Sequence, residues 1–145
     1  MTSPSPDPAV GLQARIDALR HTVTSGATLD LDRRRAHLGA LRRLIVDHEP
    51  ALSAAISADV GKPELEVRLT ETSATVQEID HLLAHLEEWT APRKVPVPLT
   101  LQPATAHVRL QPKGVVLVIA PWNYPLPLLL WRRARGEDWM VVGAG

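Results

Sequence analysis

Apolar residues recur at helical spacing through the middle of the chain and predict one long helix from Pro63 to Trp89. The residues that carry this pattern are Leu65, Leu69, Thr72, Val76, Ile79, Leu83 and Leu86, which lie alternately four and three positions apart. That spacing stacks the side chains on a single stripe, and the stripe needs a partner surface. Glu64 and Glu66 lie in the first turn, where negative charge favours the positive end of the helix dipole.

Three shorter helices are predicted before the long one. The first covers about residues 10–24, and either Asp30 or Asp32 caps the second. The apolar face of the second helix consists of Leu31, Leu38, Leu41 and Ile45. Pro50 is suited to the first position of the third helix, which Gly61 closes in the left-handed conformation.

The composition changes after Trp89, and the chain can no longer be helical. The prolines that interrupt this segment are Pro92, Pro96, Pro98 and Pro103. Apolar and polar residues alternate at 99–102 and at 106–111, which predicts two half-exposed strands with a turn at 103–105. Such a two-stranded ribbon is marginal in water, so it needs a further surface to pair with.

The run from Val115 to Ile119 is apolar without alternation, which is typical of a strand covered on both faces in a parallel sheet. Pro121 and Pro125 end the pairing. The residues between these prolines are Trp122, Asn123 and Tyr124. In open α/β sheets ligands bind beyond the carboxyl ends of the strands, so this segment is a candidate site. The plainer interpretation is a strand followed by a tight turn.

These segments resemble the NAD(P)-dependent aldehyde dehydrogenases, most closely their class 3-like branch. The stretch 111–125 is similar to the family pattern P-x-G-V-V-L-x-I-x-P-W-N-Y-P. Upstream, 59–63 resembles D-x-G-K-P and 89–92 resembles W-x-x-P, in the family's order. Between them lies a helix that matches a glutamate-rich helix of the family through Glu64, Glu66 and Glu71. The resemblance covers about residues 30–131.

The resemblance implies an α/β fold built of several parts. Residues 10–91 form a helical N-terminal region, and residues 92–131 form a β-ribbon, the first buried strand of an incomplete Rossmann-like domain and the start of the next helix. Such ribbons in the family dock against another subunit, so a homo-oligomer is expected. Residues 1–9 are expected to be a disordered leader.

The resemblance also implies roles for individual residues. Asn123 matches the asparagine whose amide, with a backbone N–H, holds the oxygen of the thiohemiacetal formed when a cysteine attacks an aldehyde. Such an oxyanion needs preorganised donors. The residues that match the lining of the NAD or NADP cleft are Ile119, Ala120, Pro121 and Trp122. Tyr124 matches a residue that borders the substrate tunnel.

The departures from the family pattern concern the catalytic machinery. The chain has no cysteine, and it lacks the K-P-S-E, E-L-G-G-K and G-S-x-x-x-G segments. We therefore expect an N-terminal piece that is inactive alone and binds no cofactor stably. The tail, 132–145, is charged where the family has an apolar helix, although Met140 to Gly145 look like a strand entering a turn. A reading-frame change near Trp131 is our hypothesis for this tail.

Two other functions stay open. The chain could be a non-catalytic helical interaction module that associates with full-length subunits through the helix stripe and the ribbon. It could also be a remnant of a nucleotide-binding domain, but one strand without a βαβ repeat cannot build the dinucleotide crevice.

Composition and charge exclude several classes of partner. Lys and Arg number 16 and Asp and Glu also number 16, so no net field attracts nucleic acid or an anionic membrane. The arginine cluster Arg33, Arg34, Arg35, Arg42 and Arg43 suggests nucleic-acid binding, but neighbouring aspartates favour a solvated face.

His81 and His85 are one turn apart and could hold a metal ion, although surface histidines are the simpler interpretation and no metal site is expected. The absence of cysteine and of a signal peptide is compatible with a cytoplasmic location.

Overall fold

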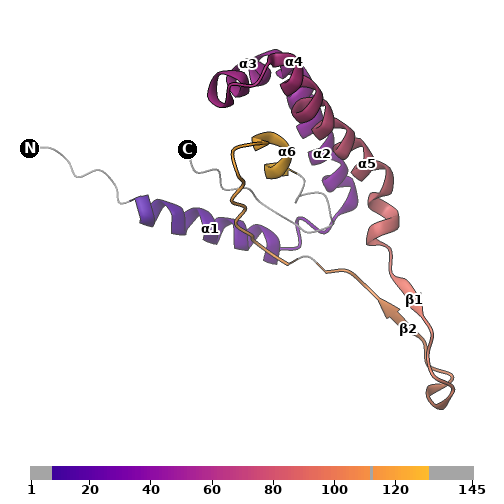
Figure 1. Cartoon of the computed structure of the whole chain (residues 1–145). Helices are drawn as coiled ribbons and strands as arrows, with labels where there is room; N and C mark the ends of the chain where they lie inside the picture. The colour runs from indigo at the N-terminus through magenta and orange to yellow at the C-terminus, as the bar shows by residue number, and fades with distance from the viewer. Residues whose placement is uncertain (1–7, 112, 131–145) are drawn as a thin grey trace, which may run out of the picture.

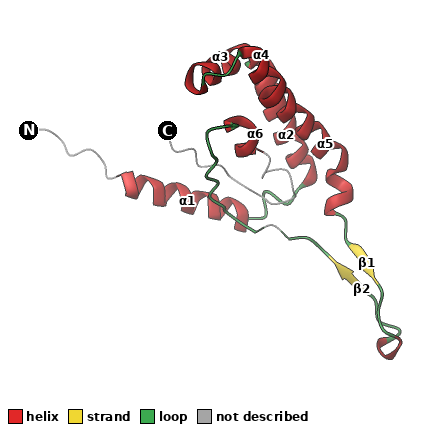
Figure 2. Cartoon of the chain, viewed as in Figure 1, coloured by secondary structure: helices red, strands yellow, loops and turns green. Residues whose placement is uncertain are grey.

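The computed structural model describes residues 8–111 and 113–130 (Figure 1). Its helices are α1 (Pro8–Thr24), α2 (Leu31–Asp47), α3 (Glu49–Val60), α4 (Glu64–Val67), α5 (Ser73–Thr90) and α6 (Pro125–Leu130). A π-helical turn, Arg68–Thr72, joins α4 to α5 without a break. The two strands, β1 (Arg93–Val95) and β2 (Ala106–Val108), form a hairpin that extends away from the helices (Figure 2). No helix in this part of the chain is long and apolar enough to span a membrane.

The helix boundaries confirm the local signals. Asp30 caps α2, because its carboxylate accepts a hydrogen bond from the Asp32 N–H at 2.9 Å. Pro50 lies in the first turn of α3, and Gly61 ends that helix at φ 74°. Helix α1 begins at Pro8, so residues 8 and 9 are helical and do not belong to the disordered leader expected at residues 1–9. The remainder of that leader and the tail 132–145, including the strand-like Met140 to Gly145, lie outside the described residues.

The predicted stripe of the long helix is correct only in its C-terminal half. Thr72, Ile79 and Leu86 are buried, but Leu65 and Leu69 are 67% and 62% exposed. The π turn is the physical reason, since its extra residue rotates the helix face before it relative to the face after it. The wider turn also allows two consecutive residues, Glu71 and Thr72, to be buried.

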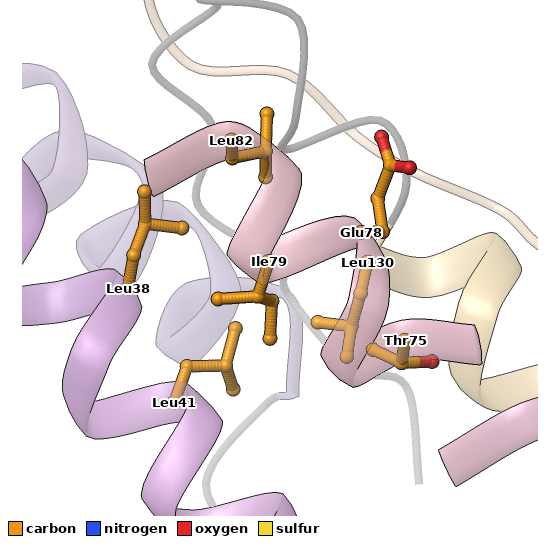
Figure 3. A pocket seen from close by; sticks show the side chains of 7 residues that line it. All are labelled: Leu38, Leu41, Thr75, Glu78, Ile79, Leu82 and Leu130. Atoms are coloured by element: carbon orange, nitrogen blue, oxygen red, sulfur yellow. The ribbon is translucent and has the colours of Figure 1, made fainter. Parts of the chain in front are cut away.

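Helices α2 and α5 pack side by side and form most of the core, to which Leu19 of α1 and Val67 of α4 also belong. Their buried apolar residues are Ile45 from α2 and Ile79, Leu82 and Leu86 from α5. A small cavity beside them is lined by Leu38, Leu41, Thr75, Glu78, Ile79, Leu82 and Leu130 (Figure 3). Leu130 belongs to α6, so the end of this short helix packs against the α2–α5 pair.

An ion pair joins the exposed edges of α2 and α5. The guanidinium of Arg42 donates to both carboxylate oxygens of Asp80, at 2.7 and 3.1 Å. These hydrogen bonds hold the pKa of the Asp80 carboxyl below its usual value and raise the pKa of Arg42. Elsewhere in the arginine cluster, Arg35 pairs with Glu87 at 3.0 Å.

We expect the Arg42–Asp80 pair to give a small acid-sensitive contribution to stability. Because the pKa of Asp80 is lowered in the folded chain, its contribution is present above the unfolded value of about 4 and is lost as the pH falls through the folded value. The melting temperature of Asp80→Asn should therefore fall less between about pH 5 and pH 2 than that of the parent. Identical acid profiles would show that the pair contributes nothing.

The strand prediction at 99–102 is wrong, and that at 106–111 is correct only for its first residues. Leu99–Leu101 is a one-turn 3₁₀ helix at the tip of the hairpin, and the partner of β2 is β1. The strands are antiparallel, with Lys94 opposite His107. Prolines on both sides of the tip limit the ladder, because a proline has no N–H to donate.

The buried strand predicted at 115–119 is also wrong for this chain. Residues 113–120 form neither a helix nor a strand, and Leu117 and Ile119 are 67% and 85% exposed. A strand of a parallel sheet requires a neighbouring strand that pairs with its backbone. The part of the chain that the structure describes provides none for this segment.

We expect Gly61→Ala to destabilise the chain through the backbone alone. Nothing lies within 4 Å of the added Cβ, but φ is +74°, and an L-residue in the left-handed region costs about 1–2 kcal/mol. Gly39→Ala is the matched control, because Gly39 lies inside α2 and its Cβ would meet only an Arg43 nitrogen at 3.7 Å. That substitution should stabilise the helix by about 0.5–1 kcal/mol. Urea unfolding of both variants measures the difference, and equal shifts would contradict the assignment.

Candidate functional site

The candidate site is the turn at Trp122 and Asn123, which leads directly into α6. Pro125 is the first residue of α6, and Pro127 follows in the same turn. Prolines are tolerated there because the N–H groups of a first helical turn have no partner within the helix. The helix starts with a hydrogen bond from the Leu128 N–H to the Tyr124 carbonyl at 3.2 Å.

Lys62 reaches this turn from the loop between α3 and α4. Its Nζ lies 2.9 Å from Oε1 of Glu71 and 2.5 Å from the carbonyl oxygen of Asn123. The same ammonium sits 3.7 Å from the centre of the Tyr124 ring, a cation–π contact. A lysine ammonium has three N–H donors, and here it meets three acceptors. The backbone of Lys62 is itself held, because the Ser57 hydroxyl donates to its carbonyl at 2.6 Å.

Glu71 completes the contact from the π turn. Its side chain is 0% exposed and that of Lys62 is 13% exposed. While Oε1 accepts from Lys62, Oε2 accepts from the Leu126 N–H of α6 at 3.2 Å. Removing two charges from water is costly, and it is offset only when the pair has good geometry and further hydrogen bonds. This pair has both.

The structure brings Lys62, Glu71 and the backbone of Asn123 together. It leaves the side chains that were predicted to bind ligands open to solvent. The carbonyl of Asn123 is held by Lys62, whereas the residue as a whole is exposed. Ile119 and Trp122 are 85% and 80% exposed. Pro121 is exposed, Ala120 is half-buried and Tyr124 is 38% exposed.

Lys62 and Glu71 are the residues that reasoning from the sequence missed. Both lie in segments that carry the family resemblance, but neither received a role. One signal was available, because Glu71 lies four residues after Val67 and four before Thr75, which are both buried. An acidic residue on a buried stripe requires a partner. The π turn places Glu71 on the buried stripe, and the apolar spacing in the sequence does not show this turn.

The histidine pair is part of an aromatic row on α5. The rings of His81 and His85 lie 4.3 Å apart, and His85 stacks on Trp89 at 5.2 Å. Nδ1 of His85 lies 2.8 Å from the His81 carbonyl oxygen, which can only accept, so Nδ1 carries the proton. Over residues 8–111 and 113–130, no three potential metal ligands among His, Asp and Glu gather in one place.

Comparisons with known proteins all match this chain to aldehyde dehydrogenases. The model of the aldehyde dehydrogenase family matches residues 11–135, which extends further toward the N-terminus than the motif resemblance at 30–131. The chain is 37% identical over 112 residues to aldehyde dehydrogenase family 3 comG of Dictyostelium discoideum, covering 77% of this chain and 24% of that protein. It is 40% identical over 113 residues to family 3 member H1 of Arabidopsis thaliana, covering 78% and 23%.

A solved structure agrees with these relatives. The substrate-bound state of Staphylococcus aureus AldH superposes on 90% of this chain and 29% of that chain, with a TM-score of 0.84 and 28% identity. The chain thus spans about a quarter of the length of the curated relatives it matches.

Proposed function

The chain belongs to the aldehyde dehydrogenase family, and from this we propose that it supplies the oxyanion-binding asparagine of an enzyme that oxidises an aldehyde to a carboxylic acid. In such an enzyme a cysteine thiolate forms a bond to the aldehyde carbon, and the carbonyl oxygen takes up the negative charge. The side-chain amide of Asn123 donates to that oxygen. NAD or NADP, when bound, accepts the hydride that leaves the same carbon.

One observation carries the proposal. Asn123 combines a backbone carbonyl held by Lys62 with a residue open to solvent. An oxyanion hole requires a donor that is oriented before charge develops and remains accessible to substrate, and the held carbonyl restrains the backbone from which the Asn123 amide extends. A donor that is loose in the free protein loses the advantage, since it must then be ordered during the reaction.

The cofactor segment fits only part of a nicotinamide cofactor. Ile119 and Trp122 offer exposed apolar surface, which suits a flat ring. The segment 119–122 carries no charged side chain, so groups that bind the cofactor phosphates have to come from outside it. We therefore propose that these four residues line one side of the cofactor site and do not retain NAD or NADP by themselves.

A chimera tests the proposal. Residues 11–130 of this chain replace the matching segment of the Arabidopsis family 3 member H1, and NAD(P)H formation is followed with a series of aldehydes. We expect turnover from the chimera and none from the 145-residue chain, which has no cysteine to attack the aldehyde. A folded chimera without turnover, or turnover by the chain alone above a matched blank, would overturn the proposal.

A second candidate is the non-catalytic module that associates with full-length subunits. The projecting hairpin favours it, because two three-residue strands leave outer edges that can pair with another chain (Figure 1). Co-purification of the chain with an intact relative tests this candidate. Retention that is lost when β2 is interrupted by His107→Pro would support it.

A further inference from the structure

We propose that Lys62, held in place by Glu71, is the positioning residue that sets the direction of Asn123. This inference rests on the proposed function, and it concerns a contact between segments that lie 61 positions apart. Lys62 does not reach the reacting atoms in this assignment. It acts on the peptide group that joins Asn123 to Tyr124.

The contacts hold that peptide group on both sides. On the Asn123 side the ammonium binds the carbonyl oxygen at 2.5 Å, and on the Tyr124 side it lies 3.7 Å from the ring centre. A peptide group is planar, so holding its oxygen restrains the plane that contains the Cα atoms of Asn123 and Tyr124. The Cα from which the Asn123 side chain leaves the backbone is held with that plane, whereas χ1 and χ2 are separate rotations.

Glu71 makes this arrangement rigid. The buried carboxylate orients the ammonium with one oxygen and holds the Leu126 N–H with the other. The segment 123–126 is therefore anchored at a carbonyl, a ring and an N–H by one ion pair. Lys62 lies at the α3–α4 corner and Glu71 lies in the π turn. Helix packing sets the positions of both segments.

The chemistry of lysine suits this task. An ammonium directs its three donors at three separate acceptors, whereas a guanidinium is planar and directs its donors in a fork. Lys62→Arg therefore keeps the charge beside Glu71 but cannot reproduce the contacts to both Asn123 and Tyr124. Lys62→Met keeps an unbranched apolar side chain, one heavy atom shorter, and loses every donor.

Nuclear magnetic resonance of the isotope-labelled 145-residue chain tests the inference directly. The test variant is Lys62→Met with Glu71→Gln, which leaves no unpaired charge and keeps an acceptor for the Leu126 N–H. We expect its helices to melt cooperatively while the carbonyl ¹³C resonance of Asn123 shifts or broadens. In the parent, the Lys62 methylene protons next to Nζ should be shifted upfield by the Tyr124 ring, and Tyr124→Leu should abolish that shift.

The matched control is Arg42→Met with Asp80→Asn, which removes an exposed ion pair between α2 and α5. It should leave the Asn123 resonances unchanged. If the Lys62→Met/Glu71→Gln variant also leaves them unchanged, the inference is wrong. A shift of equal size in both variants would likewise overturn it, because a general loosening of the fold would then explain the result.

Kinetics in the chimera separate this inference from the proposed function. The Lys62→Met/Glu71→Gln variant should lower kcat about 10²-fold with little change in KM for the cofactor, since a misplacement of about 1 Å has an effect of that size. Lys62→Arg should not rescue kcat. A parent chimera without turnover counts against the proposed function alone, and the resonance measurements still decide the inference. An active chimera whose kcat does not change in the variant contradicts the inference alone.

Discussion

Replacing Asn123 with alanine in the chimera should lower kcat about 10²- to 10³-fold, the usual effect of losing one oxyanion donor. The proposed role places the side-chain amide against the oxygen on which charge develops, so the loss falls on the transition state and KM for the aldehyde should change little. Asn123→Asp should be at least as slow, because it replaces a donor with an acceptor that carries the same charge as the oxyanion. Steady-state kinetics of the purified proteins measure both variants.

The control for Asn123→Ala removes an amide side chain elsewhere. Gln77 is exposed on α5, and Gln77→Ala should leave kcat at the parent value. The melting temperature of the Asn123→Ala chimera should also match the parent, because Lys62 binds the backbone carbonyl, which alanine retains. A kcat for Asn123→Ala within a factor of about two of the parent would remove this residue from the mechanism.

Glu71→Ala should be the most destabilising of the single substitutions discussed. It leaves the Lys62 ammonium, 13% exposed, without a counter-charge, and it leaves the Leu126 N–H without its acceptor. Breaking a buried ion pair by removing one partner typically costs about 3–5 kcal/mol. Urea unfolding of the 145-residue chain, followed by circular dichroism, measures the loss.

Two further variants show whether charge burial is the cause. Lys62→Met/Glu71→Gln should recover much of the lost stability, because neither partner is then an isolated charge. Asp80→Ala removes the acid of a half-exposed pair and should cost far less than Glu71→Ala, since water screens that pair. If Glu71→Ala and Asp80→Ala are equally stable, the buried pair does not contribute as the structure suggests.

The helices could be predicted because their signals are local. Asp30 at the start of α2 and Gly61 at the end of α3 act on their own helices, and both behave as their residue types predict. The π turn has no comparable signal in the sequence, because the pattern of apolar residues fits a regular helix equally well. For that reason the sequence pattern places Leu65 and Leu69 on a stripe that the structure does not bury.

The strands could not be predicted to the same extent, because a strand is stabilised by partners distant in sequence. The segment 115–119 has the composition of a covered strand, but the described residues provide no neighbour to cover it. Asn123 was expected at the end of a buried strand, but the structure has no such strand and places Asn123 in a turn two residues before α6. The contact with Lys62 could not be predicted, since nothing in either segment indicates which residue 61 positions away will meet it.

The long reach of the Lys62 contact bears on the order of folding. The contact between Arg42 and Asp80 closes a loop of 38 residues, whereas that between Lys62 and Asn123 closes one of 61. We expect the α2–α5 pair to assemble before residues 113–130 dock on it, and the longer loop favours this order by only about 0.4 kcal/mol. In the native chain we expect partial opening to release residues 113–130, with α6 detaching while the helical core stays intact. We therefore expect the site to order after the α2–α5 pair and to be released before it.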